Sequence, residues 1–348
     1  MIKVAIIGAS GYAGAELIRI LRRHPGVQLV GLASRTHAGQ PLSAAWPHLP
    51  DPTPFTSPDA ALAEADTVFL ATPNGYAMQI VPTLLERGQR VIDLSADYRL
   101  PPPVFEAWYG LPHTSPEHYP NATYGLVELH RHELPEARLV ANPGCYVTAA
   151  TLALAPLAAE GLAHHLIVNA ASGVSGAGRD AAGTSFAEIN EDYKPYKPAG
   201  THRHTPEIEL NLARVQAQGR HVRTHGERRD LTLTFVPHLV PMTRGILVTA
   251  YATPPTPPTE AELYELYRAF YAHEPFVRVT EALPRTKGTW GANTVWIALR
   301  LDARTGRIVV FAALDNLVKG AAGQAVQNFN RMHGFDETTA LDTAGVWP

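Results

Sequence analysis

The sequence predicts an α/β protein in which a doubly wound parallel sheet is followed by an α+β region with a mixed or antiparallel sheet. Up to Cys145, short apolar runs alternate with segments of helical spacing, a pattern typical of parallel strands joined by crossover helices. After Cys145, most segments are β-rich, and a single strong helix at 259–274 interrupts them. This change in pattern predicts two domains, which a chain of 348 residues commonly forms.

The elements of the first part follow from the positions of apolar residues. Residues 2–7, "IKVAII", have the length of a buried parallel strand, and the glycine-rich "GASGYAG" follows at 8–14. The same reasoning predicts strands at 27–34, 65–72 and 90–96, helices at 15–24 and 76–88, and a proline-rich loop at 45–58.

The second part begins with an Ala/Leu-rich helix directly after Cys145. Its strands are predicted at 165–172, 228–239, 245–252, 293–302 and 306–315. A helix rich in small residues, at 316–334, closes the pattern.

Composition excludes several classes of function. Apolar residues make up 45% of the chain, charged residues 18%, and the mean hydropathy is -0.09, as in ordinary globular proteins. The formal net charge of -3 gives no general attraction to nucleic acid or to an anionic membrane. The apolar runs are too short to span a bilayer, and the N-terminus does not resemble a signal peptide. A single cysteine forms no internal disulfide, so we expect a cytoplasmic protein.

The glycines at 8, 11 and 14 lie between a predicted strand and a predicted helix. In that context they let backbone amides approach a pyrophosphate at the helix N-terminus, as in a Rossmann-type domain. The alternative is a turn that only requires positive φ.

The type of cofactor follows from the end of the second strand. A site that prefers NAD usually has a carboxylate there, whereas this chain has "ASRTHAG". Ser34 and Arg35 suit a 2′-phosphate, because arginine adds charge and a planar fork of donors. Arg35 as an ordinary surface residue is the alternative. We therefore predict NADP(H), bound by Gly8, Ser10, Gly11, Tyr12, Ala13, Gly14, Ser34, Arg35, Thr72, Pro73, Ser175, Gly176 and Asn316.

Cys145, in "NPGCY", is the candidate nucleophile. Pro143 and Gly144 force a turn, and the helix that follows directs its N-terminus at the thiol. The unpaired amides and the helix dipole there favour the thiolate, which is the reactive form. Next to a dinucleotide site, such a cysteine indicates attack on an acyl carbon and reduction of the thioester by hydride. A small inert core residue is the alternative.

His202 and His204, in "AGTHRHTPEIE", are candidates for acid/base chemistry because their spacing puts them on one side of an extended segment. Thr205 is predicted to cap the next helix, with Pro206 in its first position and Glu207 in its first turn. A structural role is one alternative. A metal site is another, but further ligands are not close in the sequence, so we expect none.

Two more loops have the composition of anion sites. In "SGVSGAGR" (172–179), glycines and serines can turn amides toward a phosphate, and Arg179 adds charge. "DNLVKGAAG" (315–323) opens the last helix with an asparagine, a lysine and small residues. Either loop could equally be a turn and a packing helix.

These motifs, together with "DLSADYRL" (93–100), "YKPYKPAGTHRHTPEIE" (193–209) and "FVPHLVPMTRGIL" (235–247), resemble the N-acetyl-γ-glutamyl-phosphate reductase family. The resemblance extends from the first strand to the last helix. It implies an NADPH-dependent reductive dephosphorylation in arginine biosynthesis, related to that of aspartate-semialdehyde dehydrogenase. It also implies a homo-oligomer, dimer or tetramer, whose last helix returns to the Rossmann domain. The domains would then be 1–145 with 316–348, for NADP binding, and 146–315, for catalysis and oligomerisation.

The resemblance also implies a mechanism. Cys145 would expel phosphate from a small-molecule acyl phosphate, and NADPH would reduce the thioacyl enzyme to release N-acetylglutamate semialdehyde. His202 and His204 would be the acid/base candidates, without a choice between them. Substrate would be bound by Arg99, Asn142, Ser172, Gly173, Tyr196 and Glu207.

Two other functions remain open at this stage. A related reductase of lysine biosynthesis acts on 2-aminoadipyl phosphate attached to an acidic carrier protein, but its cysteine usually lacks the preceding proline and is followed by asparagine, unlike "NPGCY". A non-catalytic NADP-binding regulator would have little reason to keep both Cys145 and the histidine pair.

Overall fold

The computed structural model describes residues 1–49, 53–179, 185–219, 231–254 and 256–347. Parts of two predicted segments, the loop at 45–58 and the strand at 228–239, fall outside these residues. The chain forms two compact units. The first unit comprises Met1–Gly144 and Ala321–Thr343, and the second comprises Cys145–Gly320 and Ala344–Pro348.

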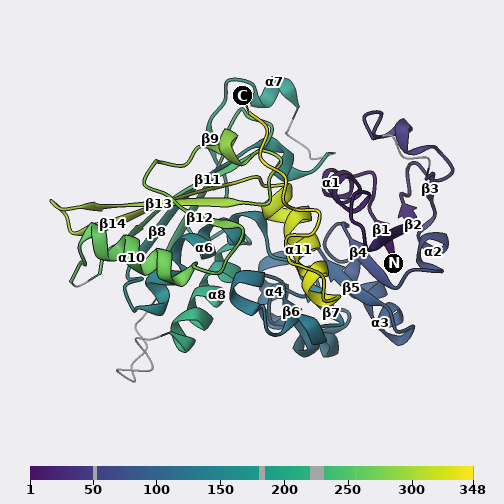
Figure 1. Cartoon of the computed structure of the whole chain (residues 1–348), viewed down its shortest axis with the longest axis horizontal. Coiled ribbons are helices and arrows are strands. Elements are labelled where there is room, and N and C mark those ends of the chain that lie inside the picture. Colours follow the sequence, from purple (N-terminus) through teal and green to yellow (C-terminus); the bar gives the residue numbers. More distant parts are fainter. Residues whose placement is uncertain (50–52, 180–184, 220–230, 255, 348) are drawn as a thin grey trace. The chain divides into compact units, whose positions relative to one another are not determined.

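The first unit contains a seven-stranded sheet with strand order β3-β2-β1-β4-β5-β7-β6, in which every neighbouring pair is parallel (Figure 1). Its strands are β1 (Ile2–Ile7), β2 (Val27–Ala33), β3 (Phe55–Thr56), β4 (Thr67–Leu70), β5 (Arg90–Asp93), β6 (Ala122–Tyr124) and β7 (Leu139–Ala141). Its α-helices are α1 (Tyr12–Leu21), α2 (Pro58–Leu62), α3 (Ala77–Glu86), α4 (Pro102–Tyr109), α5 (Val127–His130) and α11 (Gly323–Met332).

The central strands of this sheet are apolar on both faces. Val4, Ala5 and Ile6 of β1 have no exposed surface, and all four residues of β4 are buried. A strand with helices on both faces must be apolar throughout, which explains the continuous run "VAII". The doubly wound sheet predicted from these runs is confirmed.

The last helix, α11, belongs to the first unit. It packs against α1 and α5, which lie far from it in the sequence. His24, just after α1, hydrogen-bonds Asn330 of α11 at 2.9 Å, and Asn328 donates to the carbonyl oxygen of Gly125 at 2.8 Å. Two asparagines and a histidine thus attach this helix to the domain that the N-terminal strands begin.

Short strands were missed. The loop predicted at 45–58 contains β3, and the sequence pattern gave no indication of β6 and β7, which complete the sheet. These strands are two or three residues long, too short for any periodicity, and their positions depend on pairing with longer neighbours.

The second unit contains a mixed seven-stranded sheet with order β12-β13-β14-β11-β8-β10-β9. β8 and β10 pair in parallel, as do β12 and β13, and the other pairs are antiparallel. The strands are β8 (Leu166–Ser172), β9 (Lys194–Pro195), β10 (Leu233–Leu239), β11 (Ile246–Ala252), β12 (Val277–Val279), β13 (Val295–Asp302) and β14 (Arg307–Leu314). The α-helices are α6 (Cys145–Ala159), α7 (Phe186–Ile189), α8 (Thr205–Gln218) and α10 (Glu260–Phe270). The mixed sheet and the strong helix α10 confirm the predicted α+β class.

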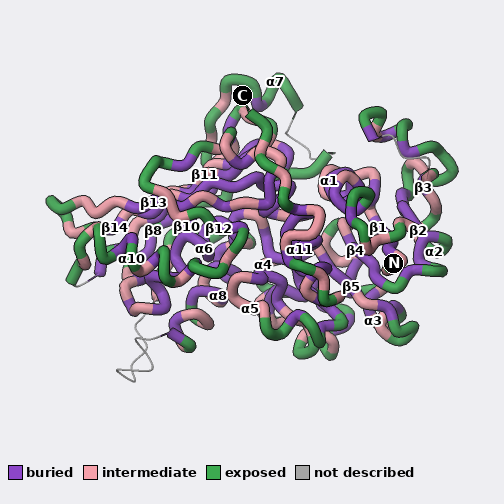
Figure 2. Tube along the Cα trace, in the orientation of Figure 1, coloured by how far each residue is buried: buried purple, intermediate pink, exposed green. Residues whose placement is uncertain are grey.

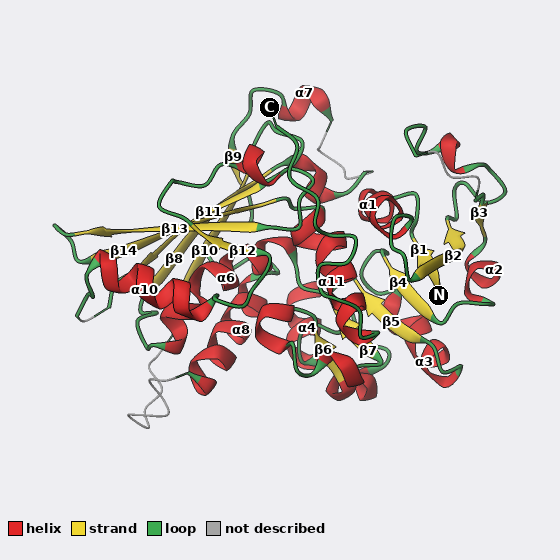
Figure 3. Ribbon diagram, in the orientation of Figure 1, coloured by secondary structure: helices red, strands yellow, loops and turns green. Residues whose placement is uncertain are grey.

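Helices α6, α8 and α10 contact this sheet, and they lie together on one side of it (Figure 3). Strand β11 alternates strictly between buried and partly exposed residues, which is the pattern of a sheet with one covered face (Figure 2). The register aligns the partly exposed positions of three neighbouring strands. They are Ile167 and Asn169 of β8, Leu247, Thr249 and Tyr251 of β11, and Val309 and Phe311 of β14.

Helix α6 is apolar on every side, and all of its residues after Cys145 are buried. A helix with this composition is stable only when protein surrounds it completely. Within the described residues, no helix is long and apolar enough to cross a membrane.

Candidate active site

Cys145 is the first residue of α6. β7 ends at Ala141, and Asn142, Pro143 and Gly144 make the turn into the helix, as "NPGC" predicts. The three turn residues are buried, whereas Cys145 is partly exposed. A helix of 15 residues therefore begins at an accessible thiol, where its first backbone amides have no partner within the helix.

The side chain next to the thiol, Tyr146, organises the histidine pair. Its ring lies edge-on to His202 and His204, with centroids 5.7 Å and 5.9 Å away. The two imidazoles are themselves 4.8 Å apart. Tyr196 donates a hydrogen bond of 3.1 Å to the Tyr146 hydroxyl, which donates to the carbonyl oxygen of His238 at 3.2 Å. Four predicted site residues thus lie around the side chain of Tyr146, which was not among the predictions. The four are Cys145, His202, His204 and Tyr196.

His202 and Tyr196 are neutral near pH 7. Burial, and then the positive charges of Lys197 and Arg203, lower the pKa of His202 to about 4. The backbone amide of His204 donates to Nδ1 of His202 at 3.1 Å, so the proton of the neutral ring is on Nε2. Burial raises the pKa of Tyr196 to about 12. His202 and Tyr196 are therefore hydrogen-bond donors rather than charged groups.

The predicted helix cap is wrong by one residue. His204 is the N-cap of α8, and no side chain caps it, while Thr205, Pro206 and Glu207 form the first turn. The reason is that the chain already turns before Thr205, whose amide donates to the carbonyl oxygen of His202 at 2.9 Å. Glu207 has no exposed surface.

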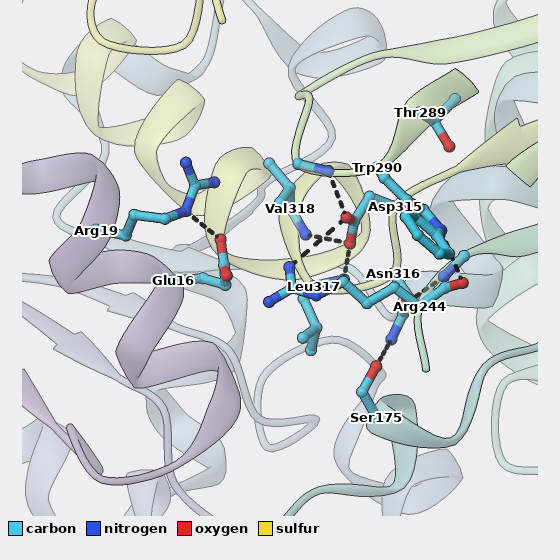
Figure 4. Close-up of polar contacts among 12 residues, drawn as sticks. Glu16, Arg19, Ser175, Arg244, Thr289, Trp290, Asp315, Asn316, Leu317 and Val318 are labelled. Carbon is cyan, nitrogen blue, oxygen red and sulfur yellow. Dashed lines mark hydrogen bonds and ion pairs between the residues drawn. The ribbon is translucent and has the colours of Figure 1, made fainter. Parts of the chain in front are cut away.

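The loop after β8 contacts the end of β14. The amide nitrogen of Asn316 donates to the Ser175 hydroxyl at 2.9 Å, and its oxygen accepts from the backbone N–H of Gly245 at 2.7 Å (Figure 4). A Cβ at Gly173 would lie 2.7 Å from the carbonyl oxygen of Thr243, so this position tolerates only glycine. Ser172 is buried, and its hydroxyl donates to the carbonyl oxygen of Gly173.

The two predicted anion loops differ in their charged groups. Arg179 and Gly176, in the loop after β8, are exposed. Lys319, in the 315–323 loop, has no exposed surface, and its Nζ lies 5.5 Å from the centre of the Phe276 ring. The ammonium of Lys319 is therefore directed into the protein.

The glycine loop of the first unit allows a close approach of backbone. Gly8 has φ +85°, and a Cβ there would lie 2.2 Å from the carbonyl oxygen of Ala71. At Gly14 it would lie 2.4 Å from the carbonyl oxygen of Gly8. Gly11 is the N-cap of α1, and no side chain caps the helix. Tyr12 and Ala13 begin α1, so its first amides are available to an anion.

Ser10 and Ser34 are joined across this loop by a hydrogen bond of 2.8 Å between their hydroxyls. Arg35, the next residue, is exposed. Trp46 was not predicted, yet its Nε1 donates to the carbonyl oxygen of Ala9 at 3.1 Å and its ring lies 6.2 Å from that of Tyr12. Trp46 could not be singled out by sequence pattern, because it lies in the proline-rich segment.

Thr72 and Pro73 follow β4 at the same edge of the sheet. The hydroxyl oxygen of Thr72 is buried and has no hydrogen-bond partner among the described residues, while Pro73 is exposed. Asp97 holds the loop beyond them: its carboxylate accepts from the amides of Gly75 and Met78 at 2.8–3.1 Å. A buried polar atom beside a glycine cradle fits a bound dinucleotide.

Arg99 and Asn142 lie together in the first unit. Nε of Arg99 donates to the carbonyl oxygen of Asn142 at 2.7 Å, and Nη2 donates to that of Leu94 at 2.6 Å. Both residues are buried. The carbonyl contacts fix the guanidinium beside the turn that leads to Cys145.

The predicted residues thus form two sets. The first unit contains the glycine loop, Ser34, Arg35, Thr72, Pro73, Arg99 and Asn142, and the second unit contains Cys145, the histidine pair, Tyr196, Glu207 and the 172–176 loop with Asn316. Across the described residues, no three His, Cys, Asp or Glu side chains are close enough to hold a metal ion.

Comparison with known proteins agrees with this arrangement. Residues 3–137 match the family model described as "Semialdehyde dehydrogenase, NAD binding domain", and residues 145–316 match "Semialdehyde dehydrogenase, dimerisation domain". Among solved structures, aspartate semialdehyde dehydrogenase II from Vibrio cholerae has a TM-score of 0.72 at 16% identity, over 96% of this chain and 98% of that one. The Candida albicans enzyme with NADP has a TM-score of 0.69 at 15% identity, over 96% of this chain and 99% of that one. These two show the fold.

Sequence relatives are much closer. N-acetyl-γ-glutamyl-phosphate reductase from Thermus thermophilus is 61% identical over 345 residues, covering 99% of this chain and all of the relative. The reductase from Desulforudis audaxviator is 49% identical over the full length of both chains. Identity of this extent, together with both domain matches, establishes that the chain belongs to the N-acetyl-γ-glutamyl-phosphate reductase family.

Proposed function

We propose that this chain reduces N-acetyl-γ-glutamyl phosphate to N-acetylglutamate 5-semialdehyde with NADPH and releases phosphate, as a step of arginine biosynthesis. The observation that carries the proposal is the only cysteine, placed at the N-terminus of a buried helix beside a histidine pair. The relatives at 61% and 49% identity bear the name of this reductase.

Cys145 begins the reaction. Its thiolate attacks the acyl carbon, the bond from that carbon to the phosphate oxygen breaks, and the phosphate takes the electron pair and a proton. A thioester on Cys145 remains. NADPH, when bound, supplies the hydride that reduces this thioester. The resulting thiohemiacetal on Cys145 then expels the thiolate and releases the semialdehyde, so that the nucleophile is regenerated.

The two histidines have different roles in this proposal. Because the pKa of His202 is about 4, His202 is a poor base near pH 7, and its Nε2–H suits hydrogen bonding to a substrate oxygen. We assign the acid/base step to His204. Its place at the N-cap of α8 puts it beside the helix N-terminus, whose partial positive charge favours neutral imidazole. Tyr196 and Glu207 complete the substrate-binding set with Arg99, Asn142, Ser172 and Gly173.

The first unit binds NADPH in this proposal. Gly8, Gly11 and Gly14 let the pyrophosphate reach the uncapped amides of α1, and Ser34 with Arg35 holds the 2′-phosphate. Ser10, Tyr12, Ala13, Thr72 and Pro73 belong to the same proposed set, which also includes Ser175, Gly176 and Asn316. Residues 1–145 with 316–348 would then serve the cofactor, and 146–315 catalysis and oligomerisation. A reduced Cys145 requires a reducing compartment, so we place the protein in the cytoplasm.

We propose that a second copy of the chain covers the open face of the second sheet. Ile167 is 46% exposed there, and Tyr251, Val309, Leu247 and Phe311 are partly exposed beside it. Asn169 and Thr249 share this face, which is otherwise apolar. A largely apolar open face of this kind marks an interface, and the matching family model is described as a dimerisation domain.

The first prediction tests the reaction and its nucleophile. In the reverse direction, N-acetylglutamate semialdehyde, phosphate and NADP should yield NADPH. Cys145→Ser should lose several orders of magnitude in kcat, because a hydroxyl is a far weaker nucleophile than a thiolate. Iodoacetamide should stop turnover with one label per chain and leave NADP binding intact. Substantial activity in Cys145→Ala would contradict the covalent mechanism, and activity only with carrier-linked 2-aminoadipate semialdehyde would assign the chain to the lysine branch.

The second prediction concerns cofactor choice. Arg35→Ala should weaken NADPH binding by about 10- to 100-fold, the value of a charged hydrogen bond, and NADH binding by much less. Dissociation constants for both cofactors provide the measurement. Arg87→Ala, which removes an exposed arginine at the end of α3 in the same unit, is the matched control. Equal losses for the two cofactors in Arg35→Ala would assign Arg35 a structural role.

The third prediction separates the histidines. His204→Asn should lower kcat by about 10²–10⁴-fold, the usual contribution of acid/base catalysis. His202→Asn should mainly raise KM. Because burial lowers the pKa of His202 to about 4, its imidazole remains neutral until the pH falls to that range. The pH profile of kcat/KM between 5 and 8 should therefore lose one ionisation in His204→Asn and keep it in His202→Asn. The reverse pattern would exchange the two roles.

The fourth prediction concerns assembly. Ile167→Asp and Tyr251→Asp place a charge on the open face of the second sheet and should convert the oligomer to a smaller species, as measured by light scattering. Leu283→Asp, at another side chain that is 53% exposed, should leave the mass unchanged. If the mass of the native chain were that of a monomer, or if Ile167→Asp and Tyr251→Asp retained the native mass, this face would not be the interface.

A further inference from the structure

Asp315, the residue after β14, is a carboxylate without exposed surface. One of its oxygens accepts from the backbone amides of Leu317 and Val318 at 2.8 Å and 3.2 Å. The other accepts from the amide of Gly291 at 2.8 Å and lies 3.7 Å from Nη1 of Arg244. Figure 4 shows these contacts converging on the two oxygens. Both oxygens are needed as acceptors, which a carboxylate provides and an amide does not.

These contacts join three segments of the second unit that are distant in the sequence. Gly291 and Trp290 lie between η5 (Thr286–Thr289) and β13, and Nε1 of Trp290 donates to the carbonyl oxygen of Arg244 at 3.1 Å. Arg244 precedes β11, and Leu317 leads into the π-helix η6 (Val318–Ala322). Asp315 is thus the common hydrogen-bond acceptor of the loops at one end of strands β13, β14 and β11.

The π-turn that Asp315 starts ends against the nucleophile. The amide of Gly320 donates to the carbonyl oxygen of Asp315 at 2.9 Å, five residues back. A Cβ at Gly320 would lie 2.8 Å from Cβ of Cys145 and 3.3 Å from its Cα. The backbone at 320 is therefore in direct contact with Cys145, and only glycine permits this approach.

We propose that Asp315 is a positioning residue, which holds the 316–320 turn so that the backbone of Gly320 forms a wall beside Cys145 and restricts the thiol to its reactive orientation. The inference rests on the proposed role of Cys145 as nucleophile. Asp315 does not touch the reacting atoms and acts through Gly320. A displacement of about 1 Å at a reacting group can cost on the order of 100-fold in rate, so a fixed wall has a measurable catalytic value.

The test compares Asp315→Asn with the native chain. The amide nitrogen of asparagine cannot accept from Gly291 or from the Leu317–Val318 pair, so the turn loosens and the wall withdraws. We expect kcat to fall by about 10- to 100-fold. The plateau rate of Cys145 alkylation by iodoacetamide, taken from a pH series, should rise at least about threefold because the thiol becomes more accessible. A merely structural role would move neither value at temperatures well below the unfolding midpoint.

Asp302→Asn is the matched control. The carboxylate of Asp302 also accepts a backbone amide, that of Arg304 at 3.1 Å, but in the turn between β13 and β14. Its kcat and alkylation rate should equal those of the native chain. Gly320→Ala leaves the contacts of Asp315 in place and adds one methyl group at the wall itself. This variant should also lose about tenfold or more in kcat and change the alkylation rate, and it decides the matter if Asp315→Asn does not fold.

Two results would overturn the inference. In the first, Asp315→Asn and Gly320→Ala keep the native kcat and the native alkylation rate, while Cys145→Ala is inactive. This result would refute the role of Asp315 but support the proposed function. The other is a fall in kcat with an unchanged alkylation rate, which would move the effect of Asp315 from Cys145 to Asn316. Full activity in Cys145→Ala would instead refute the proposed function itself.

Discussion

Complete burial of α6 is the constraint on which the second unit depends. Its residues from Tyr146 to Ala159 are enclosed, so sheet and helices must cover every side of it. Pro156 has no N–H to donate to the carbonyl oxygen of Leu152, one turn earlier. The hydroxyl of Tyr271, just after α10, donates to that oxygen at 2.5 Å, and Tyr267 donates to the carbonyl oxygen of Ala153 at 2.6 Å. Tyr271 thus compensates for the proline in the helix that presents Cys145, and Tyr267 adds a second bond to the same turn.

The same burial determines the chemistry around the thiol. Tyr146 is anchored on α6, and the two imidazoles and Tyr196 pack around its ring. Desolvation is the largest cause of the lowered pKa of His202 and of the raised pKa of Tyr196. Neutral hydrogen-bond donors such as His202 and Tyr196 suit the approach of a doubly charged acyl phosphate.

The sequence predicted structure best at positions where only one kind of structural context suits the residues present, such as a buried strand or a glycine turn. The apolar run "VAII" of β1 predicted a buried parallel strand, and the β-rich segments after Cys145 predicted a mixed or antiparallel sheet; both are present. Gly8, Gly14 and Cys145 were found by the same logic, and their structural contexts are those expected.

Other features depend on tertiary contacts that local patterns do not contain. Strands β3, β6 and β7 are too short for a periodicity and are defined by their neighbours. The N-cap of α8 moved from Thr205 to His204 because the chain turns early at His202. The sequence indicates Asp315 only as the first residue of the 315–323 loop. Its role as an acceptor could not be predicted, because its three amide partners lie on two separate segments. Lys319 was considered for an anion but is enclosed against Phe276.

The place of α11 in the first unit has a consequence for how the chain folds. Asn328 and Asn330 reach Gly125 and His24, residues about 200 to 300 positions earlier in the chain. A chain emerging from the ribosome makes β1 to β7 first, but the helix that these elements pack against is made last. The second unit, continuous from Cys145 to Gly320 apart from a short C-terminal segment, can collapse before that helix exists. The domain that begins the sequence therefore cannot be completed until nearly the whole second unit has been synthesised.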